Sequence, residues 1–147
     1  MVLCCSDSRV PAEIVFDCGL GDLFVVRTAG HALDAAVLGT IEFGISVLDV
    51  PLMVVLGHQH CGAIEAALAT SEQGAPADSA MSSLLHGLLP AIEKSPSRQP
   101  NDVMVTNVAL TAEKVLTMAP ALQAKITGKF DIAMATYSME TGVVDFL

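Results

Sequence analysis

Three short apolar runs, each followed at once by polar residues, constrain the fold of this chain most. Residues 1–5 (MVLCC), 22–28 (DLFVVRT) and 51–57 (PLMVVLG) are β-branched and apolar, and are bounded by Gly, Pro or Asp. Runs with so little polar alternation are typical of strands that are buried on both faces of a parallel sheet. We therefore predict that these runs are strands of one mostly parallel sheet.

Helical patterns lie between and after these strands. Apolar residues recur at helical spacing in residues 33–48. We further predict a helix at 61–70, a loop at 71–79, a helix at 80–95 that Pro90 splits or kinks, a helix at 103–118 capped by Asp102, a helix at 120–128, and a strand, turn and strand at 130–147. This alternation predicts an α/β fold, a mostly parallel β-sheet flanked by helices on both faces. Because no repeat or linker divides the sequence, we expect residues 1–147 to form a single domain.

Functional groups of such sheets collect just beyond the carboxyl ends of the strands. In this sequence those ends are residues 4–9 (CCSDSR), 27–31 (RTAGH) and 57–62 (GHQHCG). Every candidate functional group in the first half of the chain lies in one of these three segments. We therefore expect a site where the three segments meet.

His58 and Cys61 form an H-x-x-C pair in the turn after the third strand. This spacing lets both side chains reach one ion, and the glycines on either side of the turn permit a tight backbone. A cysteine from the end of the first strand, Cys5 or Cys4, would complete a Cys₂His zinc site with an open fourth position, which is the pattern of catalytic zinc. The alternative is that these cysteines are buried as small apolar residues.

Strand alternation distinguishes the two adjacent cysteines. Cys5, Asp7 and Arg9 share one direction of an extended segment, and Cys4 faces the other way, so the pattern selects Cys5 as the ligand. Arg9 beside Asp7 keeps a carboxylate ionised and oriented. Next to zinc, that carboxylate could bind the metal or orient its water; the alternative is an ordinary loop salt bridge.

The overall composition excludes some classes of partner. A net charge of −9 over 147 residues disfavours nucleic acid, which needs a basic face. Hydrophobic residues make up 52% and mean hydropathy is +0.59, yet the longest apolar run is far shorter than the roughly 20 residues of a membrane span. The apolar excess predicts a homodimer or higher homo-oligomer. Without a secretion signal, the four cysteines are expected as reduced thiols in the cytoplasm.

The sequence resembles the β-class carbonic anhydrases over nearly its whole length. The segments CSDSRVPAE (5–13), FVVRTAGH (24–31), IEFGISVLDVPLMVVLGHQHCGAI (41–64) and TYSMETG (136–142) follow that family's pattern in order and spacing. The combination of C-x-D-S-R with H-x-x-C-G is highly specific. The resemblance implies the family's fold, with a mostly parallel sheet flanked by helices.

The resemblance also implies an activity and its residues. Cys5, His58 and Cys61 would bind one Zn²⁺, Asp7 and Arg9 would form the catalytic dyad, and Gly62 would line the substrate pocket. The enzyme would be a zinc lyase that hydrates carbon dioxide reversibly to bicarbonate through zinc-bound hydroxide, an effect of zinc on water for which carbonic anhydrases are the standard example. The alternatives are hydrolysis of carbonyl sulfide or carbon disulfide on the same scaffold, and a non-catalytic protein that binds zinc or bicarbonate.

The sequence departs from the family pattern in two places. Some members hold a regulatory bicarbonate with a Trp–Arg–Tyr set; Arg27 and Tyr137 match two of these positions, but Val2 stands at the position of the tryptophan, so we do not expect that regulation. Family chains usually carry helices before the first strand that wrap the partner subunit. We expect this chain to be an N-terminally short version that lacks them.

Overall fold

A five-stranded sheet forms the centre of the protein. The computed structural model describes residues 1–73, 79–118 and 130–147. The sheet order is β2-β1-β3-β4-β5, with all pairs parallel except the β4–β5 pair at one edge. The strands are β1 (Val2–Cys5), β2 (Val25–Thr28), β3 (Leu52–His58), β4 (Asp131–Tyr137) and β5 (Val144–Phe146). The predicted α/β fold with a mostly parallel sheet is confirmed.

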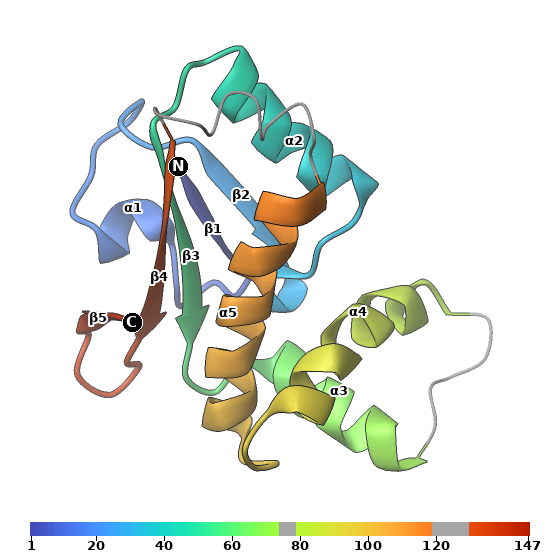
Figure 1. Ribbon diagram of the computed structural model, residues 1–147. Helices are drawn as coiled ribbons and strands as arrows, with labels where there is room; N and C mark the ends of the chain where they lie inside the picture. Colours follow the sequence, from blue (N-terminus) through green and yellow to red (C-terminus); the bar gives the residue numbers. More distant parts are fainter. Residues whose placement is uncertain (74–78, 119–129) are drawn as a thin grey trace.

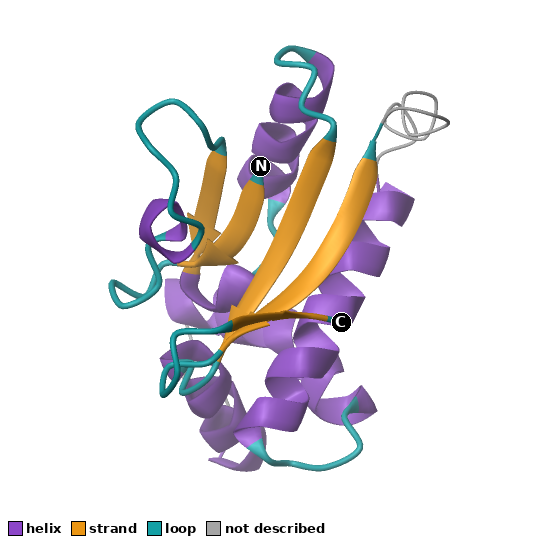
Figure 2. Ribbon diagram, turned by 90° about the vertical axis from the view of Figure 1, so that its left-hand side faces the viewer, coloured by secondary structure: helices purple, strands orange, loops and turns teal. Residues whose placement is uncertain are grey.

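The helices are distributed unevenly over the two faces of this sheet. The described helical elements are α1 (Ala12–Val15), the short 3₁₀ turn η1 (Ala29–His31), α2 (Ala35–Ser46), α3 (Gly62–Gln73), α4 (Ala80–Lys94) and α5 (Pro100–Met118). Figure 1 shows α5 lying across the sheet, α2 beside β2, and α3 and α4 packed together near the carboxyl ends of the strands. In Figure 2 the long helices lie behind the sheet, and the small α1 lies on the other side.

Two hydrophobic clusters correspond to the two faces. The larger one includes Leu3 and Cys5 of β1 and is covered by α2, α3, α4 and α5. The smaller one includes Val2 and Cys4 and is covered by α1 together with side chains of β4 and β5. All four residues of β1 are buried, which is why the sequence shows an apolar run there and no alternation.

The ends of several elements differ from the sequence prediction. α3 continues to Gln73, so the predicted loop 71–79 begins later, and Ser79 caps α4 by accepting a hydrogen bond from the backbone N–H of Met81 (3.3 Å). α4 runs through Pro90 to Lys94, so the proline does not split the helix. The predicted helix at 120–128 lies outside the described residues.

The prediction that Asp102 caps the following helix is wrong. α5 begins three residues before the predicted start at 103, at Pro100, whose ring fixes a helical φ and whose missing N–H is no loss in the first turn. Asp102 lies within that first turn and accepts a hydrogen bond from the Ser97 hydroxyl. The single turn α1 was not predicted. In the described part of the chain, no helix is both long and apolar enough to cross a membrane.

Candidate metal centre

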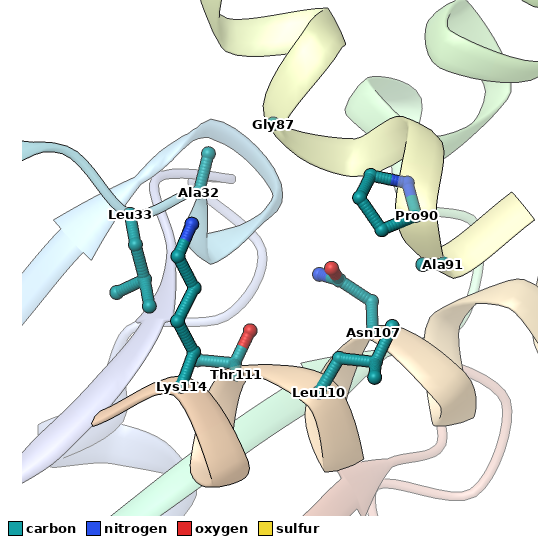
Figure 3. Close-up of a pocket in the computed structure, with 9 residues that line it drawn as sticks. All are labelled: Ala32, Leu33, Gly87, Pro90, Ala91, Asn107, Leu110, Thr111 and Lys114. Atoms are coloured by element: carbon teal, nitrogen blue, oxygen red, sulfur yellow. The ribbon is translucent and has the colours of Figure 1, made fainter. Parts of the chain in front are cut away.

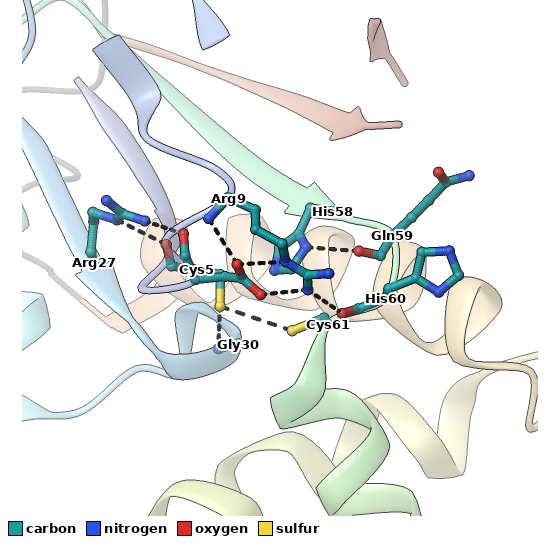
Figure 4. Close-up of polar contacts among 9 residues, drawn as sticks. Cys5, Arg9, Arg27, Gly30, His58, Gln59, His60 and Cys61 are labelled. Carbon is teal, nitrogen blue, oxygen red and sulfur yellow. Dashed lines mark hydrogen bonds and ion pairs between the residues drawn. The ribbon is translucent and has the colours of Figure 1, made fainter. Parts of the chain in front are cut away.

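The carboxyl ends of two adjacent parallel strands, β1 and β3, bring together residues that are far apart in sequence. Cys5 ends β1, His58 ends β3, and Cys61 follows β3 immediately before α3. The two sulfur atoms and a ring nitrogen of His58 lie within 4.8 Å of one another, and all three residues are buried. Figure 4 shows their side chains converging on one point between the strand ends and α3. The structure thus places the three predicted ligands in one group.

The imidazole of His58 is oriented for binding through one nitrogen. Its Nδ1 lies 2.8 Å from the carbonyl oxygen of Gln59, so Nδ1 carries the proton and donates it to that carbonyl. This leaves Nε2 with a lone pair, buried and without a hydrogen-bond partner. Buried polar atoms are nearly always satisfied, so this atom points to a missing binding partner.

The two sulfur atoms lie close enough to influence each other's protonation. Cys5 Sγ lies 4.0 Å from Cys61 Sγ, and this contact lowers the pKa of Cys5 and raises the pKa of Cys61. The backbone N–H of Gly30 donates to Cys5 Sγ at 3.2 Å, and N–H groups of the first turn of α3 face Cys61. Such donors favour thiolate, which is the form that binds metals.

The surroundings of His58 favour a positive charge. Burial works to lower the pKa of His58, but Cys5, the Gln59 carbonyl and Asp7 together raise it above its usual value. An environment that stabilises a proton on this ring also stabilises a metal cation at the same place. The pKa shift of His58 and its unpartnered Nε2 therefore both indicate a site for a cation.

Cys4 takes no part in this group. It lies in the cluster on the opposite face of the sheet, and burial raises its pKa to about 11, so it stays a neutral thiol at ordinary pH. All four cysteines of the chain are free, including the half-buried Cys18. The prediction that Cys4 and Cys5 face opposite sides of the sheet is confirmed, and the role of Cys5 as a metal ligand stays a prediction.

Asp7 and Arg9 form a doubly hydrogen-bonded pair next to the three ligand candidates. Arg9 Nε donates to Asp7 Oδ1 at 2.9 Å and Nη2 donates to Oδ2 at 2.7 Å, and these bonds hold the pKa of Asp7 far below its usual range. Arg9 Nη2 also donates to the carbonyl oxygen of His60 at 3.0 Å. The pair is therefore tied to the turn that carries His58 and Cys61 (Figure 4).

Arg27 fixes the loop that carries the pair. From the neighbouring strand β2, its Nε donates to the carbonyl of Cys5 (2.9 Å) and its Nη2 to the carbonyl of Asp7 (2.7 Å). From the sequence, Arg27 was expected at the end of a strand and at a position that matches the family's regulatory bicarbonate set. The structure shows that it holds the backbone between Cys5 and Asp7.

The remaining predicted residues have varied positions. Gly62 is the first residue of α3 and is exposed, with no heavy atom within 4 Å of where a Cβ would lie. Tyr137, which matches the regulatory bicarbonate set, is half-buried and pairs in register with His58. Sequence reasoning missed the Gly30 amide and Asn107, because backbone donors and a lone helical asparagine form no motif.

This arrangement has the composition of a zinc site. Two thiolates and one imidazole are ligands that suit zinc, and three protein ligands leave the open fourth position of a catalytic site. The second hydrogen bond of His58, to a backbone carbonyl, is the usual way in which a metal-binding histidine is oriented. The residues present fit this metal.

Comparisons with known proteins agree with the geometry. The family model described as carbonic anhydrase matches residues 1–144. Carbonic anhydrase 2 of Mycobacterium tuberculosis is 40% identical over 142 residues, covering 94% of this chain and 69% of that protein. The carbonic anhydrase of Mycolicibacterium smegmatis is also 40% identical, over 99% of this chain and 72% of that protein.

Solved structures show the same fold at lower identity. The Coccomyxa β-carbonic anhydrase in complex with acetazolamide superposes with a TM-score of 0.86 at 23% identity, covering 99% of this chain and 70% of that one. A tetrameric β-carbonic anhydrase from Sordaria macrospora gives a TM-score of 0.84 at 21% identity, covering 99% and 78%. By the family match, the 40% identity to the mycobacterial enzymes and the shared fold, this chain belongs to the β-carbonic anhydrase family.

Proposed function

We propose that this chain binds one Zn²⁺ through Cys5, His58 and Cys61 and catalyses the reversible hydration of carbon dioxide to bicarbonate. The observation that carries the proposal is the buried His58 Nε2, which has no hydrogen-bond partner and lies within 4.8 Å of two cysteine sulfurs. Membership in the carbonic anhydrase family supports this substrate. When bound, zinc would supply a Lewis-acidic open position that makes water nucleophilic near neutral pH, an effect for which carbonic anhydrases are the standard example.

Asp7 would orient the reacting water and would not store its proton. Because Arg9 holds the pKa of Asp7 far below its usual range, the carboxylate stays ionised throughout the working pH range. Oδ1 of Asp7 already accepts from both Nε and the backbone N–H of Arg9, whereas Oδ2 accepts from Nη2 alone and keeps a second lone pair for a water donor. A proton released in the reaction must therefore pass to another group or to buffer.

Gly62 would leave room for the substrate beside the metal. It follows Cys61 directly and begins α3, and the space where a side chain would project is open. Carbon dioxide is small and linear, so it needs open space beside the metal more than it needs specific contacts. This supports the assignment of Gly62 to the substrate pocket.

We extend the proposal to assembly and compartment. Phe43, Val47 and Leu48, at the end of α2 and just after it, are large apolar side chains that are 48%, 62% and 49% exposed. Such a patch supports a homodimer or higher oligomer, as in the Sordaria enzyme, which is tetrameric. The two thiolate ligands must stay reduced, which the cytoplasm favours.

The test combines metal content, mass in solution and turnover on the same preparation. We expect one zinc per chain, an oligomeric mass, and stopped-flow hydration of carbon dioxide that exceeds any hydrolysis of carbonyl sulfide or carbon disulfide. Asp7→Asn should keep its zinc and lose hydration by about 100-fold, because the water is no longer oriented. Asp131→Asn, an exposed carboxylate at the start of β4, serves as the matched control.

Two results would contradict the proposal. A wild-type protein without stoichiometric zinc would exclude the metal site. Full turnover in Asp7→Asn would exclude the Asp7–Arg9 pair from catalysis while leaving the metal assignment intact.

A further inference from the structure

A buried amide on α5 joins this helix to the turn that follows β2. Asn107 is 5% exposed, and its Nδ2 donates to the Gly30 carbonyl at 3.0 Å and to His31 Nε2 at 2.7 Å. The Gly30 carbonyl is an acceptor only, so the NH₂ end of the amide must face the turn. Both amide hydrogens are thus used on two adjacent residues.

The turn held by Asn107 has an uncommon backbone. Gly30 has φ +61° and His31 has φ +44°, so two successive residues lie in the left-handed region. A Cβ at Gly30 would also lie 3.1 Å from the Cβ of Ala63 in α3. Strained conformations of this kind persist only where the surroundings hold them, and they concentrate at functional sites.

The same turn presents a hydrogen-bond donor to a ligand candidate. The backbone N–H of Gly30 donates to Cys5 Sγ at 3.2 Å, while the carbonyl of Gly30 accepts from Asn107. The direction of this N–H depends on the turn, and the turn is tied to α5 through Asn107. His31 accepts the second hydrogen bond as a neutral ring, in keeping with its complete burial.

We propose that Asn107 is a positioning residue that, by fixing the Ala29–His31 turn, keeps the Gly30 N–H on the sulfur of Cys5. This inference rests on the proposed function, because its consequence for the metal requires Cys5 to be a ligand. Hydrogen-bond partners of metal ligands set ligand orientation and donor strength. Asn107 touches neither metal nor substrate and acts through Gly30.

The test compares Asn107→Leu with Thr111→Val. Asn107→Leu removes both donors and keeps the branched shape of the side chain. Thr111 lies one turn further along α5, is 5% exposed, and lines the same cavity of about 60 Å³ as Asn107 (Figure 3), but its side chain makes no hydrogen bond to the Ala29–His31 turn. Asn107→Ser, which keeps a single short donor, provides a milder variant if Asn107→Leu does not fold.

The first measurement needs no metal. Amide hydrogen exchange of Gly30, followed by NMR in zinc-free protein, should accelerate at least about tenfold in Asn107→Leu, since the N–H loses its fixed acceptor. Thr111→Val should leave the exchange rate of Gly30 relative to the neighbouring amides unchanged. A general loss of stability would instead accelerate all of these amides together.

The second measurement uses Co²⁺ in place of zinc. Loss of the N–H···S bond raises the energy of the sulfur electrons, so the thiolate-to-cobalt charge-transfer band of Asn107→Leu should move to longer wavelength. Its metal affinity, measured by chelator competition, should fall by about 10- to 100-fold. Thr111→Val should match the wild type in both.

The outcomes separate this inference from the proposed function. If Asn107→Leu matches Thr111→Val in Gly30 exchange, band position and affinity, the positioning role is overturned. If Gly30 exchange accelerates but the wild-type protein shows no thiolate-to-cobalt band, the hold of Asn107 on Gly30 stands and the proposed metal site fails.

Discussion

Adjacent residues of β1 face opposite sides of the sheet, and this alone gives Cys4 and Cys5 different chemistry. Cys4 is fully buried among apolar side chains on the α1 side, where its thiol stays neutral. Cys5 faces the helix side, within reach of Cys61, His58 and the Gly30 N–H. The difference arises from the two-residue repeat of a strand.

This difference predicts that alanine at position 5 lowers the zinc content of the protein, whereas alanine at position 4 does not. Cys5→Ala should purify with less than about a tenth of the wild-type zinc, because three-ligand sites lose most of their affinity with one thiolate. Cys4→Ala should keep about one zinc per chain. Elemental analysis of both variants after dialysis tests the pair, and equal zinc contents would contradict the assignment of Cys5.

Candidate site residues could be predicted from the sequence where their positions depend on neighbours close in the chain. Strand alternation separates Cys5 from Cys4, and His58 and Cys61 follow from their spacing in one turn. Asp7 and Arg9 were expected on the same extended segment as Cys5, but β1 ends at Cys5 and the pair lies in the turn that follows, where the Val10 N–H donates to the Asp7 carbonyl at 3.0 Å. The contribution of Asn107 could not be predicted, because it depends on which face of α5 meets a turn 77 residues away. A hydrogen bond of that kind is a product of tertiary packing.

At the scale of elements, the approach of α5 to the sheet depends on a glycine. A Cβ at Gly57 of β3 would lie 2.6 Å from Cγ2 of Val108, a β-branched residue of α5 with little freedom to move. The helix therefore packs directly on the backbone of the strand that carries His58. Gly57 precedes that residue, so this packing also sets the position of the candidate ligand.

Two glycine substitutions should consequently change stability in opposite directions. Gly57→Ala forces α5 away from β3 and should lower the free energy of unfolding by about 1–3 kcal/mol. Gly39→Ala, on the exposed side of α2 with open space around it, should raise it by up to about 1 kcal/mol through helix propensity. Urea unfolding at neutral pH measures both, and a neutral Gly57→Ala would show that α5 adapts freely.

The strands and long helices were predictable because burial leaves a pattern in the sequence. A buried strand is an unbroken apolar run, and a helix packed on the sheet has apolar residues at helical spacing. The runs at 1–5 and 22–28 contain the observed strands β1 and β2, and the run at 51–57 covers β3 except for its last residue, His58. The single turn α1 was missed because four residues are too few to show a helical period. The start of α5 was misplaced because Pro100 competes with Asp102 as a start signal, and the proline lies closer to the true end.

On the scale of the whole molecule, the buried polar groups are few and concentrated beside the site. Among the described residues, His31, His58, Asn107 and Thr111 are the buried side chains that are polar or charged. His31 is held between η1 and α5, and Cys5 and His58 are the titratable groups that act on it electrostatically. Protonation of His31 in this region is therefore expected to change the stability of the folded protein.

His31 should make the folded protein less stable in mild acid. Burial lowers its pKa from 6.5 to about 4, so between these values the unfolded chain takes up a proton that the folded chain does not. Stability is then present above pH 6.5 and is lost as pH falls toward 4, by about 3 kcal/mol over the window. Below about pH 4 both states are protonated and this loss stops growing.

Denaturant unfolding of chelator-treated protein at pH 7.5 and pH 4.5 tests this, since removing zinc excludes acid release of the metal as a cause. His31→Asn accepts the left-handed backbone and cannot titrate, so its stability should fall between the two pH values by about 2–3 kcal/mol less than the wild type. His86→Asn, on the exposed face of α4, should keep the wild-type dependence. An unchanged pH dependence in His31→Asn would mean that His31 binds a proton equally well in the folded and unfolded chain, which would contradict the lowering of its pKa by burial.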